Sequence, residues 1–197
     1  MVLEKQPPRE RLIASACLLF YRHGFSGVGV NELIAHAGAH KASFYRHFDS
    51  LEDLAGIYLE REGERYRSLL AFVAARAADP SDFIRRWARL VARDARSGNF
   101  LGCPIARFMG SLDQQRAAAL SPLASRILRG WVAVMAGVPE RAGLPTAASD
   151  ALATVWLRSF EADAALFAIT RDTTHFDSMR EQMFQAWRRA KSNLSET

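Results

Sequence analysis

Four hydrogen-bonding side chains lie within six residues of each other in the first quarter of the chain: Lys41, Ser43, Tyr45 and Arg46. An ammonium and a guanidinium donate to phosphate oxygens, and the two hydroxyls can reach phosphates or base edges. Proteins hold and read DNA through side chains of these types. The spacing therefore predicts a nucleic-acid-binding surface, provided that one rigid element presents these groups outwards.

That element is predicted to be the second helix of a helix-turn-helix over residues 28–48. Apolar residues recur at helical spacing in its first half, namely Val30, Leu33, Ile34 and Ala37. Gly38 breaks this pattern, because glycine accepts the left-handed conformation that ends a helix. A second short helix is expected from His40 to Phe48, with its aromatic residues on one face. Two short helices joined by a tight turn form a helix-turn-helix.

The other reactive side chains predict neither a metal site nor an enzyme. Four of the five histidines fall in the first 50 residues, but His36 and His40 lie on opposite sides of the turn. No cysteine or carboxylate joins them at ligand spacing, so we expect no metal and no cofactor. The segment GFSGVG at 24–29 matches no nucleophile or phosphate-loop motif and follows no predicted strand.

Cys103 leaves two interpretations open. It lies just before or at the start of a predicted helix, where the helix dipole favours a thiolate, and Arg107 four residues later can add positive potential. Those features suit a thiol that senses electrophiles or oxidants. Free cysteine is also a common small apolar residue of protein cores.

Composition indicates a folded protein of the cytoplasm. The chain has 197 residues, is 49% hydrophobic and carries a net charge of +5, which weakly favours a polyanionic partner. Cys17 and Cys103 are the only cysteines and suggest no disulfide framework. The first residues, MVLEKQPPRERL, lack the apolar core of a signal peptide, and no apolar run is long enough to span a membrane.

Periodicity predicts an all-α fold of about nine helices, because no strand alternation or hairpin turn appears. After the first eight residues, which read as a polar arm, a helix is expected from Arg9 to His23. Beyond the helix-turn-helix, Asp49-Ser50 is expected to cap a long helix ending near Ala78, with a possible bend at Gly63. Further helices are predicted over about 81–97, 103–119, 122–137, 146–170 and 174–193. Ser121-Pro122 is expected to separate the second of these from the third and to cap the third.

The chain resembles the TetR family of bacterial transcriptional regulators. The similarity rests on Gly24-Phe25, Val30, Glu32, Leu33, Ala37-Gly38, Ser43-Phe44-Tyr45-x-His47-Phe48 and Asp53-Leu54. It implies a three-helix DNA-binding head, placed at residues 1–50, and a helical body for ligand binding and dimerisation, placed at 51–197. Two such heads would enter successive major grooves of a palindromic double-stranded operator.

Carried over by motif position, the expected DNA contacts are Lys41, Ser43, Tyr45 and His47, with His40 and Arg46 as further candidates. Three positions depart from the family pattern. His40 replaces a serine that caps the recognition helix better, and Val28-Gly29 replaces residues with hydroxyl groups. Leu51 stands where a phosphate-binding lysine is common, so the head is expected to hold fewer phosphates.

In the body, apolar side chains supply candidates for an effector pocket and for a dimer surface. The pocket candidates are Trp87, Phe100, Cys103, Phe108, Trp131, Met135, Trp156 and Phe160, which suit an apolar or aromatic molecule. Glu161 and Asp163 lie among them and would either recognise a cation or face solvent or a partner. The predicted dimer contacts are Leu152, Val155, Met179, Met183, Phe184 and Trp187.

These observations predict a homodimeric, ligand-responsive DNA-binding regulator, with release of a repressor from its operator by a small molecule as the favoured mechanism. Activation by a protein of the same fold is an alternative within this class. The alternative from a different class is a helical thiol-based sensor or binding protein without specific DNA binding.

Overall fold

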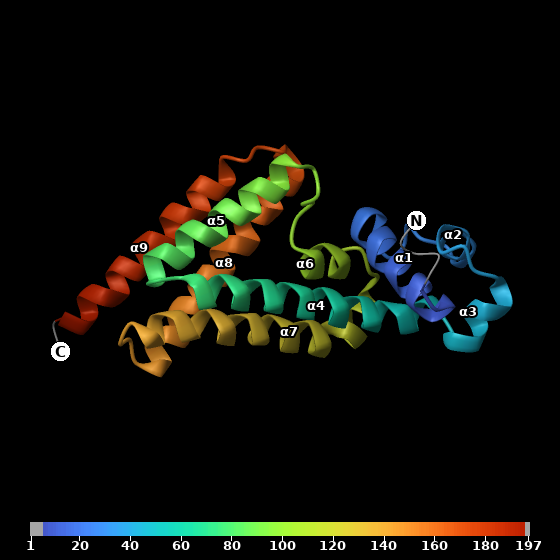
Figure 1. The fold of residues 1–197 in the computed structure, drawn as a ribbon, viewed down its shortest axis with the longest axis horizontal. Coiled ribbons are helices and arrows are strands. Elements are labelled where there is room, and N and C mark those ends of the chain that lie inside the picture. The colour runs from blue at the N-terminus through green and yellow to red at the C-terminus, as the bar shows by residue number, and fades with distance from the viewer. Residues whose placement is uncertain (1–5, 196–197) are drawn as a thin grey trace. The chain divides into compact units, whose positions relative to one another are not determined.

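The computed structural model describes residues 6–195, so most of the predicted polar arm lies outside the described residues. Within this range the chain forms nine α-helices and no strand (Figure 1). The helices are α1 Pro8–His23, α2 Val30–His36, α3 Lys41–His47, α4 Leu51–Arg76, α5 Pro80–Arg96, α6 Pro104–Met109, α7 Gln114–Arg141, α8 Thr146–Thr170 and α9 His175–Ser195. The all-α fold predicted from periodicity is confirmed.

The chain divides into two compact units. Unit 1 comprises residues 1–64 and 104–127, and unit 2 comprises residues 65–103 and 128–197. Helices α4 and α7 therefore contribute one part to each unit. The helix-turn-helix lies wholly in unit 1, together with α6 and the first half of α7.

An aromatic cluster forms the centre of unit 1. Phe20 of α1 contacts Phe25, Tyr58 of α4 and Phe108 of α6, with ring centroids 5.6, 5.8 and 5.4 Å apart. Tyr58 and Phe108 are closer still, at 4.5 Å. Aromatic pairs at these distances stabilise a fold beyond the burial of their area. The cluster gives α1, α4 and α6 a common core, and α1 in turn packs against α2 and α3.

Unit 2 has a separate aromatic core. Tyr66 of α4 stacks on Trp131 of α7 at 5.2 Å and also approaches Trp87 of α5 and Phe160 of α8. Both tryptophans are almost completely buried. Helices α8 and α9 pack together, and Trp156 of α8 donates from Nε1 to the carbonyl of Met183 in α9 at 3.2 Å.

The predicted break at Ser121-Pro122 is wrong, because α7 continues through it. Leu120, Ala124 and Ile127 are buried or half-buried at helical spacing on both sides of the break. Pro122 lies on the exposed side, where solvent can satisfy the carbonyl that a missing N–H leaves unpaired. The single helix predicted over about 103–119 is also wrong: α6 ends at Met109 and α7 begins at Gln114, where Asp113 caps it and accepts from the N–H of Arg116 at 2.9 Å.

Helix α4 continues through Gly63 without a break in its helical assignment. A Cβ at this position would lie 2.7 Å from Cγ2 of Ile127 in α7, closer than carbon atoms approach. Gly63 therefore permits close packing of the two helices within unit 1. The helical pattern alone does not distinguish a bend from a close contact, because both favour glycine.

Candidate nucleic-acid interface

The turn between α2 and α3 is built around Gly38. Its φ of 57° lies in the left-handed region that glycine adopts without steric cost. The N–H of Ala39 donates to the carbonyl of Ile34 at 3.1 Å, which closes the turn. Leu33 of α2 and Phe44 of α3 are both fully buried, so the apolar faces of the two helices fix their relative position. The predicted helix-turn-helix is confirmed.

Helix α3 presents its polar side chains to solvent, as predicted. Lys41, Tyr45 and Arg46 are exposed, Tyr45 to 50%, and Ser43 and His47 are half-buried. The ring of Tyr45 meets Phe44 edge-on, with centroids 5.1 Å apart. Because Phe44 is buried, this contact supports the Tyr45 ring at the surface with its hydroxyl available.

His40 occupies the N-cap position of α3 but makes no side-chain capping bond. Its backbone is extended and its side chain is exposed. Gly29 at the start of α2 likewise has no side-chain capping group. Both helices therefore begin with N–H groups that no capping side chain satisfies, and their partial positive charge faces outwards.

Two contacts from α1 hold the helix-turn-helix in place, and sequence reasoning did not anticipate either. Arg11 donates from Nη2 to the carbonyl of Gly38 at 3.1 Å, and His36 Nδ1 lies 2.9 Å from the hydroxyl of Ser15. Both contacts join residues more than twenty positions apart, so the local spacing of apolar residues cannot predict either contact.

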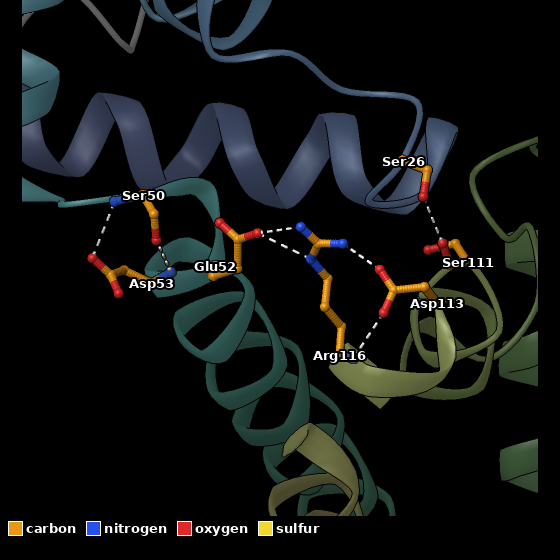
Figure 2. Close-up of polar contacts among 7 residues, drawn as sticks. All are labelled: Ser26, Ser50, Glu52, Asp53, Ser111, Asp113 and Arg116. Atoms are coloured by element: carbon orange, nitrogen blue, oxygen red, sulfur yellow. Dashed lines mark hydrogen bonds and ion pairs between the residues drawn. The ribbon is translucent and has the colours of Figure 1, made fainter. Parts of the chain in front are cut away.

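The first turn of α4 is closed by the predicted cap. Ser50 Oγ accepts from the N–H of Asp53 at 3.3 Å, and Asp53 Oδ2 accepts from the N–H groups of Ser50 and Asp49 at 3.3 and 2.8 Å (Figure 2). This reciprocal arrangement is a capping box with aspartate in place of glutamate. It fixes the point at which the chain leaves α3 and enters α4.

The segment from α6 to α7 is bonded to the helix-turn-helix region at several points. Arg116 of α7 binds Glu52 of α4 and also pairs with Asp113 (Figure 2). The hydroxyl of Ser26 donates to the carbonyl of Ser111 at 3.0 Å. These bonds connect residues 111–116 to the loop between α1 and α2 and to the first turn of α4.

The end of α1 is also bound by α6. Arg107 donates to the carbonyls of Tyr21 and Arg22 at 2.9 and 3.0 Å. A cation at the C-terminal end of a helix interacts favourably with the helix dipole. The positive charge expected to act near Cys103 is therefore engaged by α1 instead.

Hydrogen bonding to Arg116 shifts the titration of its partners. The Arg116 guanidinium holds the pKa of the Glu52 carboxyl below its usual range. The pKa of Asp113 is also lowered, first by its capping bond from the N–H of Arg116 and then by the guanidinium. The pKa of Arg116 is raised in turn by Glu52 and Asp113. All three groups are therefore charged at neutral pH.

The candidate pocket residues are all buried but do not form one group. Trp87, Trp131 and Phe160 share the aromatic core of unit 2 with Tyr66, a residue that the sequence analysis did not select. Phe108 belongs to the core of unit 1 instead. The remaining candidates also lie in unit 2, namely Phe100, Cys103, Met135 and Trp156.

Glu161 and Asp163 both carry carboxyl groups that burial affects. Desolvation raises the pKa of Glu161, and the Cys103 thiol beside it lowers that pKa by a smaller amount. Glu161 Oε1 is fully buried and has no hydrogen-bond partner. Burial also raises the pKa of Asp163, whose carboxylate lies 3.8 Å from the ring of His175 in α9.

The predicted dimer residues divide between core and surface. Leu152, Met179 and Met183 are buried within the protomer, because α9 packs its apolar stripe against α5 and α8. Phe184 and Trp187 are half-buried, and Val155 is 39% exposed. The sequence analysis missed two further exposed apolar residues of α8, Leu166 and Ile169.

A mainly apolar groove of about 500 Å³ lies between the first half of α8 and the end of α9. Leu152 and Val155 line it from α8, and Ala186 and Ala190 line it from α9. The lining of this groove and the exposed side chains of Leu166 and Ile169 together form apolar surface on α8 that the rest of the protomer does not cover.

Residues 6–195 contain no group of three histidine, cysteine or acidic side chains arranged to hold a metal ion. None of the described helices combines the length and the apolar character needed to cross a membrane.

Residues 12–56 match a known protein family, bacterial regulatory proteins, tetR family. The HTH-type transcriptional repressor DhaR of Mycobacterium sp. (strain GP1) is 25% identical, over 98% of each chain. A putative tetR-transcriptional regulator of Streptomyces avermitilis is 26% identical, with a TM-score of 0.74 over 92% of this chain and 98% of its own. The reduced form of E. coli NemR has a TM-score of 0.70 at 22% identity, over 90% of this chain and 95% of its own.

Proposed function

We propose that this chain, which belongs to the TetR family of bacterial transcriptional regulators, is a repressor that a small molecule releases from a palindromic operator. The observation that carries the proposal is the exposed polar face of α3, held outwards by the buried Phe44. The matched residues 12–56 include most of α1, all of α2 and α3 and the start of α4. The protein is assigned to the cytoplasm, where operator DNA is located.

The proposed contacts divide by chemistry. Tyr45 and His47 hold phosphates and position α3, whereas Lys41 and Ser43 reach base edges in the major groove. Arg46 and His40 are placed at the edge of the same surface, where they can add phosphate contacts. Ser43 already accepts a bond from Arg46 Nη2 at 3.4 Å, so DNA would have to compete for this hydroxyl.

The effector is proposed to bind within unit 2, next to the aromatic side chains that Tyr66, Trp87, Trp131 and Phe160 contribute. An apolar or aromatic molecule fits such surroundings. The unpartnered Oε1 of Glu161 offers an acceptor for a cationic or hydrogen-bond-donating group on that molecule. A ligand shifts the protein towards a state that does not fit the operator only by binding that state more tightly.

Cys103 fits the core interpretation better than the sensing one. Its exposed fraction is 3%, and its side-chain partner is the carboxyl group of Glu161. Reactive cysteines lie in partly exposed, electropositive surroundings that favour the thiolate. A carboxyl group supplies no positive charge, so the thiol-sensor alternative is not favoured.

The functional unit is proposed to be a homodimer that forms through the uncovered apolar face of α8 and its groove with α9. Val155, Leu166 and Ile169 are the side chains that such a contact would bury. A two-fold contact between helix pairs forms a four-helix bundle, and its symmetry matches that of a palindromic operator.

A gel-shift assay with DNA from upstream of the protein's own gene tests the proposal. We expect a sequence-specific shift that Lys41→Ala and Tyr45→Ala abolish or weaken at least tenfold. Lys191→Ala in α9 is the control, because it removes the same charge from outside the head. If no operator fragment shifts under any effector condition, or if the control weakens binding equally, α3 is not the recognition element.

A reporter gene under the same promoter separates repression from activation. Deletion of the regulator gene should raise reporter expression if the protein is a repressor. A fall in expression would establish activation by the same DNA-binding surface.

A further inference from the structure

A groove of about 330 Å³ runs between α5 and α9 in unit 2 and is lined by arginines. Helix α5 packs along α9, and Figure 1 shows the two helices side by side. Arg85, Arg89 and Arg96 line the groove from α5, and Arg180 lines it from α9. The three arginines of α5 lie four and seven residues apart, so they form one stripe on the helix. Four guanidinium groups therefore border one small groove.

The positive charge of this groove is largely uncompensated. Asp177 is the one acidic residue in the lining, and it accepts from Arg180 Nη1 at 2.8 Å. Arg85 lies 3.7 Å from Asp82. Among the residues that the structure describes, Arg89 and Arg96 have no acidic partner. Their exposed guanidinium groups create a positive potential that attracts anions.

The Asp82 carboxylate also leaves Arg85 incompletely neutralised. Its shorter bond, at 2.6 Å, goes to Arg86, which does not line the groove. Asp82 is therefore shared between two guanidinium groups, and the longer and weaker contact is the one made to Arg85.

The floor of the groove is apolar. Ala88 and Ala92 separate the arginines of α5, and their small side chains leave the space that larger residues would fill. Phe176 and Phe184 of α9 face them, the first buried and the second half-buried. A guanidinium group binds a carboxylate or phosphate through two parallel hydrogen bonds. Aromatic rings, in contrast, pack against the apolar part of a ligand.

We propose that the α5–α9 groove binds a small organic anion, with its acidic group on Arg89 and Arg96 and its apolar body against Phe176 and Phe184. The volume of the groove lies in the range of small-molecule sites. A DNA duplex is recognised instead over a surface of the order of 1,000 Å² or more. None of the residues that line this groove belongs to α3 or to the group Tyr66, Trp87, Trp131 and Phe160, and the existence of the site does not depend on repression or on an operator.

Titration of the full chain with 8-anilinonaphthalene-1-sulfonate, followed by its fluorescence, tests the proposal. The variant pair Arg89→Gln and Arg96→Gln removes the two unpaired guanidinium groups. The pair Arg93→Gln and Arg129→Gln is the matched control, because it removes the same charge from exposed positions of unit 2 outside the groove. Thermal unfolding of both variants establishes that each remains folded.

We expect the groove variant to raise the Kd for the sulfonate about tenfold and the control to change it less than about twofold. N-phenyl-1-naphthylamine lacks the sulfonate, and its binding should be insensitive to both variants. Equal weakening by the two variants would show attraction by net charge alone and would overturn the proposal. An unchanged Kd in the groove variant would overturn it as well.

Discussion

Arg116 donates two hydrogen bonds to one carboxylate oxygen of Glu52, from Nε at 2.9 Å and from Nη2 at 2.6 Å. The pair joins the first turn of α7 to the first turn of α4, directly after the Ser50–Asp53 capping box. Residues of the C-terminal half of the chain thus hold the helix that leaves the DNA-binding region.

We expect the Arg116–Glu52 pair to contribute modestly to stability, with a small favourable coupling free energy in a double-mutant cycle. Both side chains are nearly half exposed, so water screens the attraction. Chemical denaturation of Arg116→Ala, Glu52→Gln and the double variant measures this value. Arg126→Ala is the control within α7, since its carboxylate partner Glu60 lies 3.7 Å away. A coupling no greater than that of the Arg126 pair would contradict the prediction.

The same pair predicts a dependence on pH. Because Arg116 lowers the folded-state pKa of Glu52, the contribution is fully present above the unfolded-state value near 4.5. It is lost as the pH falls through the folded-state pKa. The free-energy difference between the unaltered chain and Arg116→Ala should therefore shrink on acidification below pH 4.5. A difference that stays constant or grows in acid would rule out this linkage.

Gly63→Ala is expected to destabilise the protein by about 1 kcal/mol, even though alanine favours helices. The added Cβ would lie within 3.0 Å of three side-chain atoms of Ile127, so the contact between α4 and α7 would have to open. Gly56→Ala is the control in the same helix, where a Cβ meets nothing within 4 Å. That variant should gain up to about 1 kcal/mol.

A second substitution tests the cause of the Gly63 effect. Ile127→Ala removes the atoms that the new Cβ would meet. In the Gly63→Ala background it should cost less unfolding free energy than in the unaltered chain. Additive effects of the two substitutions would show that steric conflict is not the reason.

Glu161→Gln is expected to stabilise the protein by roughly 1 kcal/mol at pH 7, because it removes a charge that burial penalises. Burial raises the folded-state pKa of Glu161, so its proton stabilises the fold at low pH and that contribution is lost as the pH rises. The advantage of the variant should therefore vanish near pH 4. Glu140→Gln, at an exposed position of unit 2, should show no such trend. A destabilised Glu161→Gln would indicate an unseen partner for the carboxylate.

Val155→Glu together with Ile169→Glu is expected to convert a dimer into a monomer. A carboxylate on the uncovered face of α8 would be buried without a partner on association. Sedimentation should give the mass of the 21.9 kDa chain for the variant and twice that mass for the unaltered protein. Phe72→Glu is the control, because Phe72 is an exposed apolar residue of α4, 51% accessible. A dimer that survives the double substitution would place the interface elsewhere.

Local sequence patterns were enough to predict the recognition helix. The spacing of Phe44 and Phe48, and glycine at position 38, depend on neighbours along the chain, so short-range rules describe them. The cap at Asp113 was also within reach, because an aspartate precedes a helical run there. Because the sequence analysis placed a helix start at Pro122, it did not place one directly after Asp113.

Contacts between distant segments could not be predicted. An amphipathic stripe such as Met179 and Met183 must be buried, but the pattern does not say whether the protomer or a partner covers it. The same holds for Phe108, which periodicity marks as buried without assigning it to a unit. The packing of α9 against α5 and α8 shows that the protomer itself covers Met179 and Met183, and the position of α6 places Phe108 in unit 1.

All four tryptophans of the chain lie in unit 2, at positions 87, 131, 156 and 187. The DNA-binding region contains none, so intrinsic emission excited at the red edge of the protein spectrum is specific for one half of the molecule. Three of the indoles are buried, and the emission maximum should move to longer wavelength when water reaches them. Tryptophan emission can thus report the binding of an effector in unit 2, while a dye on the operator reports the release of DNA from α3. A single mixing experiment can then measure which of these two steps, effector binding or DNA release, occurs first.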